Sequence, residues 1–230
     1  MGRAQAVAVV VAAGSGSRIG SDGPKTLLAI GGRPMVVVAV EGALACPSIA
    51  AVVAVAPPGH EERIRQALTR VAGSVAVVTG GETRQRSVAA GLSAVEADAH
   101  VVVVHDAARP FASPQLFAAV VDAVLGGADA AVPVLGLVDT VKRVRGDSIV
   151  GTEPRDELAL AQTPQACRIE LLRDGLAKAQ GSGLEFTDDA GLLEWLGASI
   201  RTVAGEPGNF KITTALDLAR ADAILGSGRD

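Results

Sequence analysis

Two cations and a glycine-rich loop near the start of the chain could together bind a polyphosphate. The apolar run 7–12 stops at a glycine- and serine-rich segment that allows positive φ and close backbone approach. Such a loop turns consecutive N–H groups outward into an anion-binding concavity. Arg18 adds a bidentate fork and Lys25 a point charge, which suit a polyphosphate. We therefore predict a phosphate site made by these two cations and by the backbone amides of Ala13, Gly14, Ser15 and Gly16.

The loop matches neither of the two common nucleotide-binding templates. In the dinucleotide pattern G-x-G-x-x-G the third glycine would stand one residue before Gly20. In the P-loop pattern, Pro24 interrupts the required Gly-Lys pair between Gly23 and Lys25. Two other interpretations stay open at this point. One is an ordinary strand-to-helix turn with solvated cations, and the other is a secretory signal whose apolar segment would be near the lower limit of length.

Composition limits the classes of protein and of partner. The chain has 230 residues, enough for one α/β domain over 1–230. A net charge of −4, few aromatic residues and no long basic run argue against nucleic-acid binding. No apolar run reaches the roughly 18 to 20 residues that would span a membrane. Cys46 and Cys167 are far apart, with no metal-ligand spacing, so we expect a reduced, cytoplasmic protein.

The elements that must position these cations alternate between strand and helix. Continuous apolar runs predict strands at 7–12, 50–56, 75–79 and 100–105. Between and after them, amphipathic or capped segments predict helices at 34–45, 60–71, 87–95 and 114–125. This alternation indicates an α/β fold with a Rossmann-like, mostly parallel sheet flanked by helices.

Polar groups follow three of these strands, on the edge of the sheet where ligands bind in such folds. Besides the first loop, the third strand is followed by Gly80-Gly81-Glu82 and the fourth by a segment containing Asp106 and Arg109. Asp106 would lie where phosphates and Mg²⁺ meet, because carboxylates are preferred ligands of that ion, or it would only cap the turn before Pro110. The convergence of three loops favours a ligand site over an ordinary turn.

From residue 130 the alternation changes. Extended segments at 138–143 and 149–152, with a turn at Asp147-Ser148, predict a protruding antiparallel β-arm at about 137–157. Isolated two-stranded ribbons are marginal in water, so we expect the arm to pack on a partner subunit in a homodimer. The chain then returns through a helix at 169–179, a helix at 188–196 capped by Thr187, a strand at 199–203 and a last helix opened by 214–217.

Seven segments give the chain a family resemblance: AAGSGSRIGSDGPK, TGGETRQRSV, VHDAARPF, VDTVKR, TPQACR, TDDAGLLEWLG and NFKITTALDLARAD. In this order, over nearly the whole chain, they resemble the 2-C-methyl-D-erythritol 4-phosphate cytidylyltransferases, members of the sugar nucleotidyltransferase superfamily. The resemblance implies a transferase that uses Mg²⁺ in the non-mevalonate pathway of isoprenoid synthesis. It would join CTP and 2-C-methyl-D-erythritol 4-phosphate, giving the CDP-alcohol and pyrophosphate. A phosphate monoester has a second pKa of about 6, so the nucleophile is already ionised and His105 is expected to be structural.

The resemblance also implies roles for individual residues. Arg18, Lys25 and Lys211 would be catalytic, around the α-phosphate. The nucleotide would be bound by Ala13, Gly14, Ser15, Gly16, Gly80, Gly81, Glu82, Ser87, Asp106 and Ala107. Asp106 would also hold the metal. The polyol phosphate would be bound by Asp106, Arg109, Thr163, Thr187 and Asp188, and by Thr140 and Arg155 on the arm of the neighbouring subunit.

Two positions depart from the family pattern. Gly208 stands where an acidic residue is expected, so metal binding would depend more on Asp106, and Thr26 stands where glutamine is common. Two other functions stay open: cytidylyl transfer to another polyol phosphate, such as ribitol 5-phosphate, and non-catalytic nucleotide binding. We expect no cyclodiphosphate synthase domain after Asp230.

Overall fold

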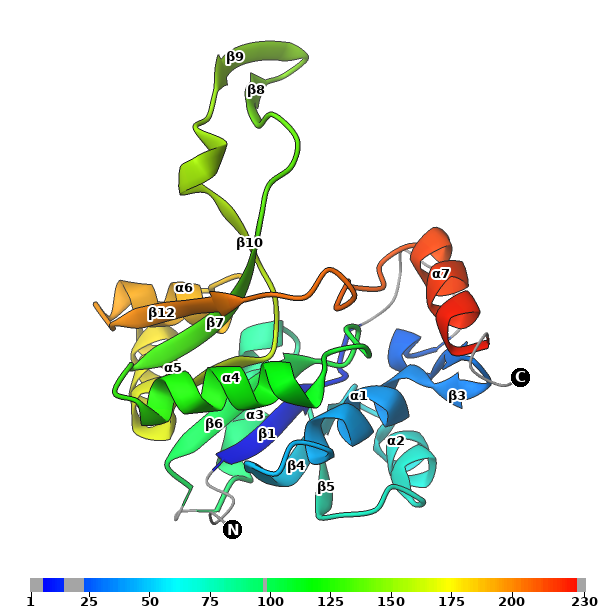
Figure 1. Ribbon diagram of the computed structural model, residues 1–230. Helices are drawn as coiled ribbons and strands as arrows, with labels where there is room; N and C mark the ends of the chain where they lie inside the picture. The colour runs from blue at the N-terminus through cyan, green and yellow to red at the C-terminus, as the bar shows by residue number, and fades with distance from the viewer. Residues whose placement is uncertain (1–5, 15–22, 97–98, 227–230) are drawn as a thin grey trace.

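A mixed eight-stranded sheet between two layers of helices forms the body of the protein, as the computed structural model shows (Figure 1). The structure describes residues 6–14, 23–96 and 99–226. Four parallel strands make up one half of the sheet, with β1 paired to β4 on one side and to β6 on the other, and β4 paired to β5. They are β1 (Ala6–Val11), β4 (Ile49–Ala56), β5 (Val75–Thr79) and β6 (Val101–Asp106). The predicted α/β fold and these four strands are confirmed.

The other half of the sheet contains reversed strands. β11 (Gln165–Arg168) runs antiparallel between β6 and β7 (Ala130–Gly136). β10 (Ala159–Ala161) continues along the same edge of β7, and β12 (Ile200–Ala204) pairs with the opposite edge in parallel. The sheet is therefore parallel where the nucleotide is expected and mixed on the side from which the arm leaves.

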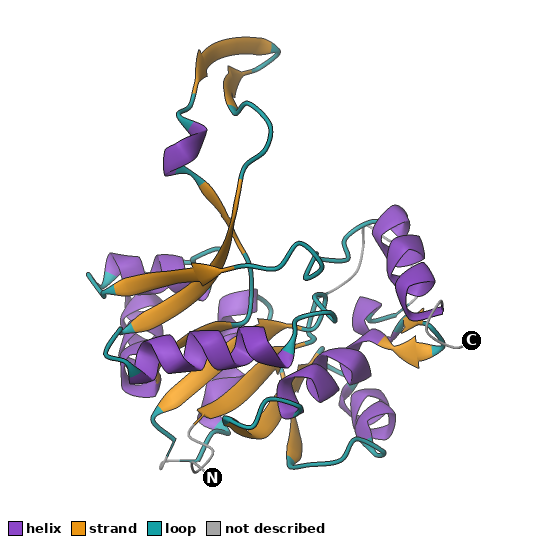
Figure 2. Ribbon diagram, in the orientation of Figure 1, coloured by secondary structure: helices purple, strands orange, loops and turns teal. Residues whose placement is uncertain are grey.

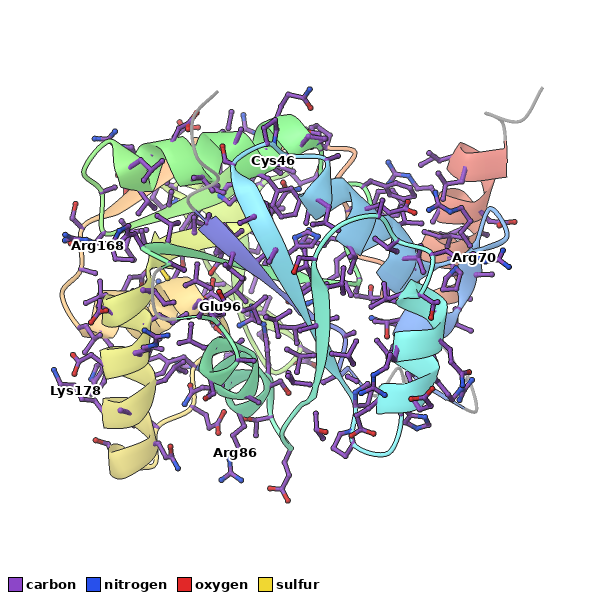
Figure 3. All side chains as sticks on the ribbon, turned by 90° about the horizontal axis from the view of Figure 1, so that it is seen from below. Cys46, Arg70, Arg86, Glu96, Arg168 and Lys178 are labelled. Carbon is purple, nitrogen blue, oxygen red and sulfur yellow. The ribbon has the colours of Figure 1, made fainter. Side chains whose placement is uncertain are left out.

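Buried aliphatic side chains hold helices on both faces of the sheet. Because alternate residues of a strand point to opposite faces, Ala8 and Val10 belong to one cluster and Val9 to the other. The first face is covered by α1 (Met35–Leu44), α2 (Glu61–Leu68) and α4 (Pro114–Leu125). The second is covered by α3 (Arg84–Ser93), α5 (Ile169–Ser182) and α6 (Asp189–Trp195). Figure 3 shows α1 and α4 on one side of the strands and α3 and α5 on the other.

The last helix, α7 (Ala215–Gly226), packs on a small hairpin of β2 (Ala29–Ile30) and β3 (Arg33–Pro34). The contact is close at Gly31, where φ is +55° and an added Cβ would lie 2.5 Å from the Cβ of Leu225. The N–H of Gly31 also donates to Asp222 Oδ1 at 2.7 Å. The chain before α7 is thereby fixed near η1 (Lys25–Leu27), a 3₁₀ turn.

A reciprocal cap begins α7. Asp217 Oδ2 accepts from the backbone N–H groups of Thr213 and Thr214 at 2.9 and 2.8 Å, while the Asp217 N–H donates to Thr214 Oγ1 at 3.2 Å. These backbone donors lower the pKa of Asp217 from 3.8 to about 2. The cap fixes the segment that leads from Lys211 into the helix.

Removing the charge of this cap gives a stability prediction. Asp217→Asn is expected to lower the free energy of unfolding by about 1 kcal/mol at pH 7, a value kept small because the carboxylate is partly solvated. Because the pKa of Asp217 is lower in the folded than in the unfolded state, where it is near 4, the ionised carboxylate stabilises the folded state above about pH 4. This stabilisation is lost as the pH falls toward about 2. Urea unfolding of both proteins from pH 7 to pH 3 should show the difference shrinking on acidification. A difference independent of pH would contradict the assignment.

The arm projects from the body as an antiparallel ribbon (Figures 1 and 2). It contains β8 (Lys142–Arg145), β9 (Ser148–Thr152) and the short η2 (Arg155–Glu157). Several of its apolar side chains are exposed, with Val138 at 86%, Ile149 at 65% and Val144 at 64%. The ribbon therefore presents apolar surface that its own chain does not cover.

Some predicted element boundaries were wrong. The turn of the arm is Gly146-Asp147 rather than Asp147-Ser148, because Gly146 takes the positive φ, at +62°. β8 begins at Lys142 rather than 138, and α2 is shorter than predicted at both ends. α3 begins at Arg84 rather than 87, because Thr83 Oγ1 accepts from the N–H of Arg86 and caps the helix earlier. The cap of α6 is Asp188 rather than Thr187.

None of the helices in the described residues is long and apolar enough to cross a membrane.

Candidate active site

Backbone hydrogen bonds join the loops that leave the carboxyl ends of the parallel strands. The N–H of Ala12 donates to Val55 O at 2.9 Å, and the N–H of Ala107 donates to Val11 O at 3.0 Å. On the other side, the N–H of Gly80 donates to Ala56 O at 2.7 Å. The segments that the sequence singled out after β1, β5 and β6 therefore meet at one edge of the sheet.

Gly80, Ala13 and Ser87 are in close contact there. A Cβ on Gly80 would lie 2.8 Å from Ser87 Oγ and 2.9 Å from Ala13 Cβ, closer than real Cβ atoms approach other atoms. Ser87 Oγ accepts from the N–H of Gly81 at 3.1 Å and donates to Thr83 O at 2.9 Å, so the hydroxyl fixes the glycine turn. The neighbouring Glu82 is exposed and pairs with Arg86 at 3.2 Å. The turn is therefore tightly packed and leaves no room for a side chain at Gly80.

Asp106, the last residue of β6, is held between two cations. Lys211 Nζ lies 2.6 Å from Asp106 Oδ2, and Arg84 Nε lies 3.3 Å from Asp106 Oδ1. Burial alone would raise the pKa of this carboxyl, but Arg84 and Lys211 outweigh it and hold the pKa well below its usual value. Asp106 is therefore an anion whose two oxygens both have cationic partners.

Lys25 and Lys211 approach the site from opposite ends of the sequence. Lys25 Nζ donates to Ile212 O at 2.8 Å, and the N–H of Ile212 donates to Ala108 O at 2.8 Å. Thr26 Oγ1 also donates to Ala12 O at 3.1 Å, which ties η1 to the end of β1 and gives this departure from the family pattern a structural role. The structure thus pairs Lys211 with Asp106 and ties Lys25 to the residue that follows Lys211. Ser15, Gly16 and Arg18, which were predicted to bind phosphate with them, lie outside the described residues.

Arg109 lies beside the same segment. Its Nη1 donates to Asn209 O at 2.9 Å, and its Nη2 donates to Ala161 O at 3.4 Å. Its buried Nε has no partner within the described ranges. Burial lowers the pKa of Arg109, opposed by Asp106, but a guanidinium remains charged at any physiological pH. The residue therefore offers a cation that is fixed beside the segment around Asn209.

Thr163 and His105 form a buried chain of hydrogen bonds behind Asp106. The carbonyl of Arg109 can only accept, so the His105 Nε2, 3.0 Å away, carries the proton. His105 Nδ1 then accepts from Thr163 Oγ1 at 3.1 Å, and Thr163 Oγ1 accepts from the N–H of Asp106 at 3.0 Å. Burial lowers the pKa of His105 to about 4, so the ring is neutral at pH 7. This chain positions Asp106, in agreement with the expected structural role of His105.

The other predicted substrate-binding residues fall into two places. Asp188 lies at the start of α6, where its Oδ1 accepts from the N–H of Gly191 and its Oδ2 from Gln165 Nε2, both at 2.9 Å; Thr187 beside it is exposed. Thr140 and Arg155 are exposed on the arm, where Arg155 Nη1 donates to Val138 O at 2.6 Å. The arm that carries both residues projects away from the sheet that contains β6 (Figure 1).

Asp106 could hold a metal ion together with the phosphate oxygens of a bound nucleotide. Among the described residues, no three His, Cys, Asp or Glu side chains gather closely enough to hold a metal ion alone. Mg²⁺ is commonly held by one or two carboxylates together with phosphate oxygens and waters, so Asp106 with a triphosphate would be sufficient. At Gly208, an added Cβ would meet no described atom within 4 Å. The missing acidic residue is thus a difference of sequence and not a steric exclusion.

Sequence reasoning missed four residues that organise the site. Arg84 Nη2 lies 2.7 Å from Asp189 Oδ2, so this arginine joins Asp189 to Asp106. Asn209 Nδ2 donates to Thr163 O at 2.8 Å, and Gln162 Nε2 donates to Asn209 O at 3.2 Å. All four stand in or beside segments already singled out. The rule that a buried carboxylate needs a cationic partner would have pointed to Arg84.

Comparisons with known proteins agree with this geometry. The family model of 2-C-methyl-D-erythritol 4-phosphate cytidylyltransferase matches residues 6–227. The chain is 45% identical to the 2-C-methyl-D-erythritol 4-phosphate cytidylyltransferase of Rhodococcus jostii over 228 residues, covering 99% of this chain and 98% of the relative. The structure resembles that of the cytidylyltransferase of the same name from Thermus thermophilus, with a TM-score of 0.80 and 36% identity, covering 95% of this chain and 98% of that one.

A second solved structure gives the same result. The 4-diphosphocytidyl-2C-methyl-D-erythritol synthase of Anaerococcus prevotii matches with a TM-score of 0.84 and 32% identity, covering 96% of this chain and 97% of that chain. Sequence, fold and the order of the site segments thus agree over nearly the full length. The chain belongs to the 2-C-methyl-D-erythritol 4-phosphate cytidylyltransferase family.

Proposed function

We propose that this protein catalyses cytidylyl transfer from CTP to 2-C-methyl-D-erythritol 4-phosphate, with release of pyrophosphate. The observation that carries the proposal is the grouping of Asp106, Lys211 and Lys25 at the carboxyl ends of the parallel strands, in a member of this family. The reaction belongs to the non-mevalonate route to isoprenoids.

The chemistry needs cations more than it needs a base. An oxygen of the acceptor phosphate attacks the α-phosphorus of CTP, a new P–O bond forms, and the bond from the α-phosphorus to the bridging oxygen breaks as pyrophosphate leaves. The nucleophile is ionised at neutral pH, since the second pKa of a phosphate monoester is about 6. Two anions must approach each other, and fixed cations and N–H dipoles offset this repulsion in the transition state.

Lys25, Lys211 and Arg18 are proposed to hold the triphosphate and to stabilise charge at the α-phosphate. The first two are near one another through Ile212, and the backbone amides of Ala13, Gly14, Ser15 and Gly16 would bind the remaining phosphate oxygens. The turn at Gly80 and Gly81, fixed by Ser87, would select the small pyrimidine base by its narrowness, with Glu82 and Ala107 near the ribose.

Mg²⁺ is proposed as the cofactor, held by Asp106 and the phosphates of CTP. When bound, it would neutralise phosphate charge and orient the triphosphate for in-line attack. Asp106 contributes the anionic ligand, and its ion pair with Lys211 keeps both groups at the place where the phosphates enter. Arg109, Thr163, Thr187 and Asp188 are proposed to lie on the side of the acceptor.

A homodimer with shared sites is proposed from the exposed apolar surface of the arm. Thr140 and Arg155 would then bind the acceptor phosphate in the site of the neighbouring subunit, where an arginine suits a phosphate dianion. Each site would take the lysines from one chain and the arm from the other.

Subunit complementation tests this arrangement. Lys211→Ala and Arg155→Ala homodimers are each expected to be nearly inactive, whereas a doubly tagged heterodimer of the two should regain about half of the wild-type activity, because one of its two sites is intact. Product formation by the purified heterodimer is the measurement. The matched control is a heterodimer of Lys211→Ala with Lys25→Ala, which places one defect in each site and should stay inactive. A fully active monomer in sedimentation, or no recovery in the first heterodimer, would exclude shared sites.

The choice of acceptor is tested by kinetics with each candidate. With saturating CTP and Mg²⁺, kcat/KM should be at least about tenfold higher for methylerythritol 4-phosphate than for ribitol 5-phosphate, since loss of one hydrogen-bonded group costs of this order or more. Preferred turnover of ribitol 5-phosphate would overturn the assignment of substrate. Binding of CTP with no release of its pyrophosphate in the presence of either acceptor would favour a non-catalytic module.

A cytoplasmic location is proposed from the state of the cysteines. Both Cys46 and Cys167 are free thiols buried in the core, and burial raises the pKa of Cys167 well above its usual value. Such thiols are compatible with a reducing compartment.

A further inference from the structure

Arg84 is the only side chain in the described cluster at the site that touches two buried carboxylates. Its Nε lies 3.3 Å from Asp106 Oδ1 and its Nη2 lies 2.7 Å from Asp189 Oδ2. The carboxylates are 9% and 5% exposed, and the guanidinium is 24% exposed. A planar fork with fixed donors can bridge two anions in one geometry, which the single ammonium of a lysine cannot reproduce.

The second partner of Asp106 is held differently. Lys211 reaches the same carboxylate through Oδ2 at 2.6 Å, but its side chain is 40% exposed and stands on a segment that enters the site from beside α7. A phosphate that binds the other N–H donors of Lys211 would share the charge of the lysine with Asp106. Arg84 would then be the cationic side chain that stays paired with Asp106 without sharing its charge with a phosphate, beside the proposed metal.

Asp189 would hold Arg84 in place when a phosphate binds. Asp189 is the first residue of α6, and the helix is fixed independently of the cations. Gln165 Oε1 accepts from the N–H of Ala190 at 3.0 Å, and Asp188 caps the same turn. The carboxylate that anchors Arg84 is thus carried by an element that packs on the face of the sheet opposite α1 and α4.

We infer that Arg84 is a positioning residue that, anchored by Asp189, fixes the Asp106 carboxylate for the metal and the phosphates while Lys211 binds a phosphate. The inference rests on the proposed cytidylyl transfer at Asp106 and Lys211. It deepens that function by assigning the residue that holds Asp106 in place beside the lysine. Arg84 itself acts through Asp106.

A double-mutant cycle tests this role, because a residue that acts through Asp106 has little to contribute once Asp106 is altered. Arg84→Gln should lower kcat/KM by about tenfold to hundredfold, and Arg84→Lys should recover only part of this loss because the bridge is broken. In an Asp106→Asn background, the added Arg84→Gln change should cost less than about threefold. Arg65→Gln removes an arginine from an exposed ion pair on α2 and serves as the matched control, with unchanged kinetics expected.

The same double-mutant cycle is repeated with the Kd of CTP, measured by titration calorimetry in the presence of Mg²⁺. This measurement needs no turnover. Arg84→Gln should weaken binding in the wild-type background and have little effect in the Asp106→Asn background. Asp189→Asn should weaken binding in the same direction as Arg84→Gln, and it provides a second variant if Arg84→Gln does not fold. The role of Arg84 would be overturned if the single effects of Arg84→Gln and Asp106→Asn on kcat/KM or Kd multiplied in the double variant. It would also be overturned if Arg84→Gln behaved like Arg65→Gln. A wild-type protein that binds CTP but forms no product would instead contradict the proposed reaction, while the calorimetric cycle still decides on Arg84.

Discussion

Replacing Lys211 by alanine is expected to lower kcat/KM for cytidylyl transfer by about 10²–10³-fold, the usual loss when one fixed donor to a developing anion is removed. Lys211 Nζ lies 2.6 Å from Asp106 Oδ2, and the residue after it is joined to Lys25 and to Ala108 by hydrogen bonds. The loss should appear mainly in kcat, because the contact with the α-phosphate strengthens as charge develops there. Steady-state kinetics with CTP and the acceptor provide the measurement.

The control for this variant is Lys178→Ala. Lys178 is 57% exposed and pairs with Asp174 one turn earlier on α5, so its loss should leave kcat/KM unchanged. An equal decrease in both variants would point to an effect of net charge. Near-normal turnover by Lys211→Ala would contradict the proposed role of the lysine.

Asp106→Asn is expected to lower kcat/KM by about 10²-fold or more, and to raise the Mg²⁺ concentration needed for half-maximal rate, because a neutral amide is a weak ligand for this ion. The substitution keeps the shape of the side chain but removes the anion between Arg84 and Lys211. Rates measured across a range of Mg²⁺ concentrations test both expectations. Unchanged dependence on Mg²⁺ would remove Asp106 from the metal site.

The same substitution has an expected effect on stability. Arg84 and Lys211 hold the pKa of Asp106 below its unfolded value, so the ion pairs stabilise the folded state above about pH 4 and this stabilisation is lost as the pH falls. Asp106→Asn should therefore lower the free energy of unfolding at pH 7, by about 1 to 3 kcal/mol, with the remaining Arg84–Asp189 pair limiting the loss. Urea unfolding at pH 7 and pH 3 should show a smaller difference at the lower pH.

The parallel half of the fold could be predicted because its signals are local. β5 and α4 have the predicted bounds, since a short apolar run and a Ser-Pro start are each sufficient to define the element. The reversed β11 between β6 and β7 could not be placed from its four residues, because its position is set by pairing with strands distant in sequence. Strand pairing of this kind depends on tertiary contacts that periodicity does not encode.

The site was predictable as a set of segments and less so as a set of contacts. Asp106, Lys211 and Lys25 were named from the sequence, and the structure places them together. The bridge from Arg84 to Asp189 joins residues 105 positions apart, so no local pattern could indicate it. Asp188 was predicted to bind substrate, yet both of its oxygens have partners in the protein, and whether it also reaches the acceptor stays a prediction.

Phosphorus NMR of a reaction mixture tests the central claim most directly. The protein is incubated with CTP, Mg²⁺ and 2-C-methyl-D-erythritol 4-phosphate, and the ³¹P spectrum is followed with time. Attack at the α-phosphorus predicts that the three CTP resonances decrease together, with equal amounts of inorganic pyrophosphate and of a diphosphate diester appearing in their place. Release of orthophosphate with formation of CDP, or a CTP spectrum that does not change, would contradict cytidylyl transfer at this site.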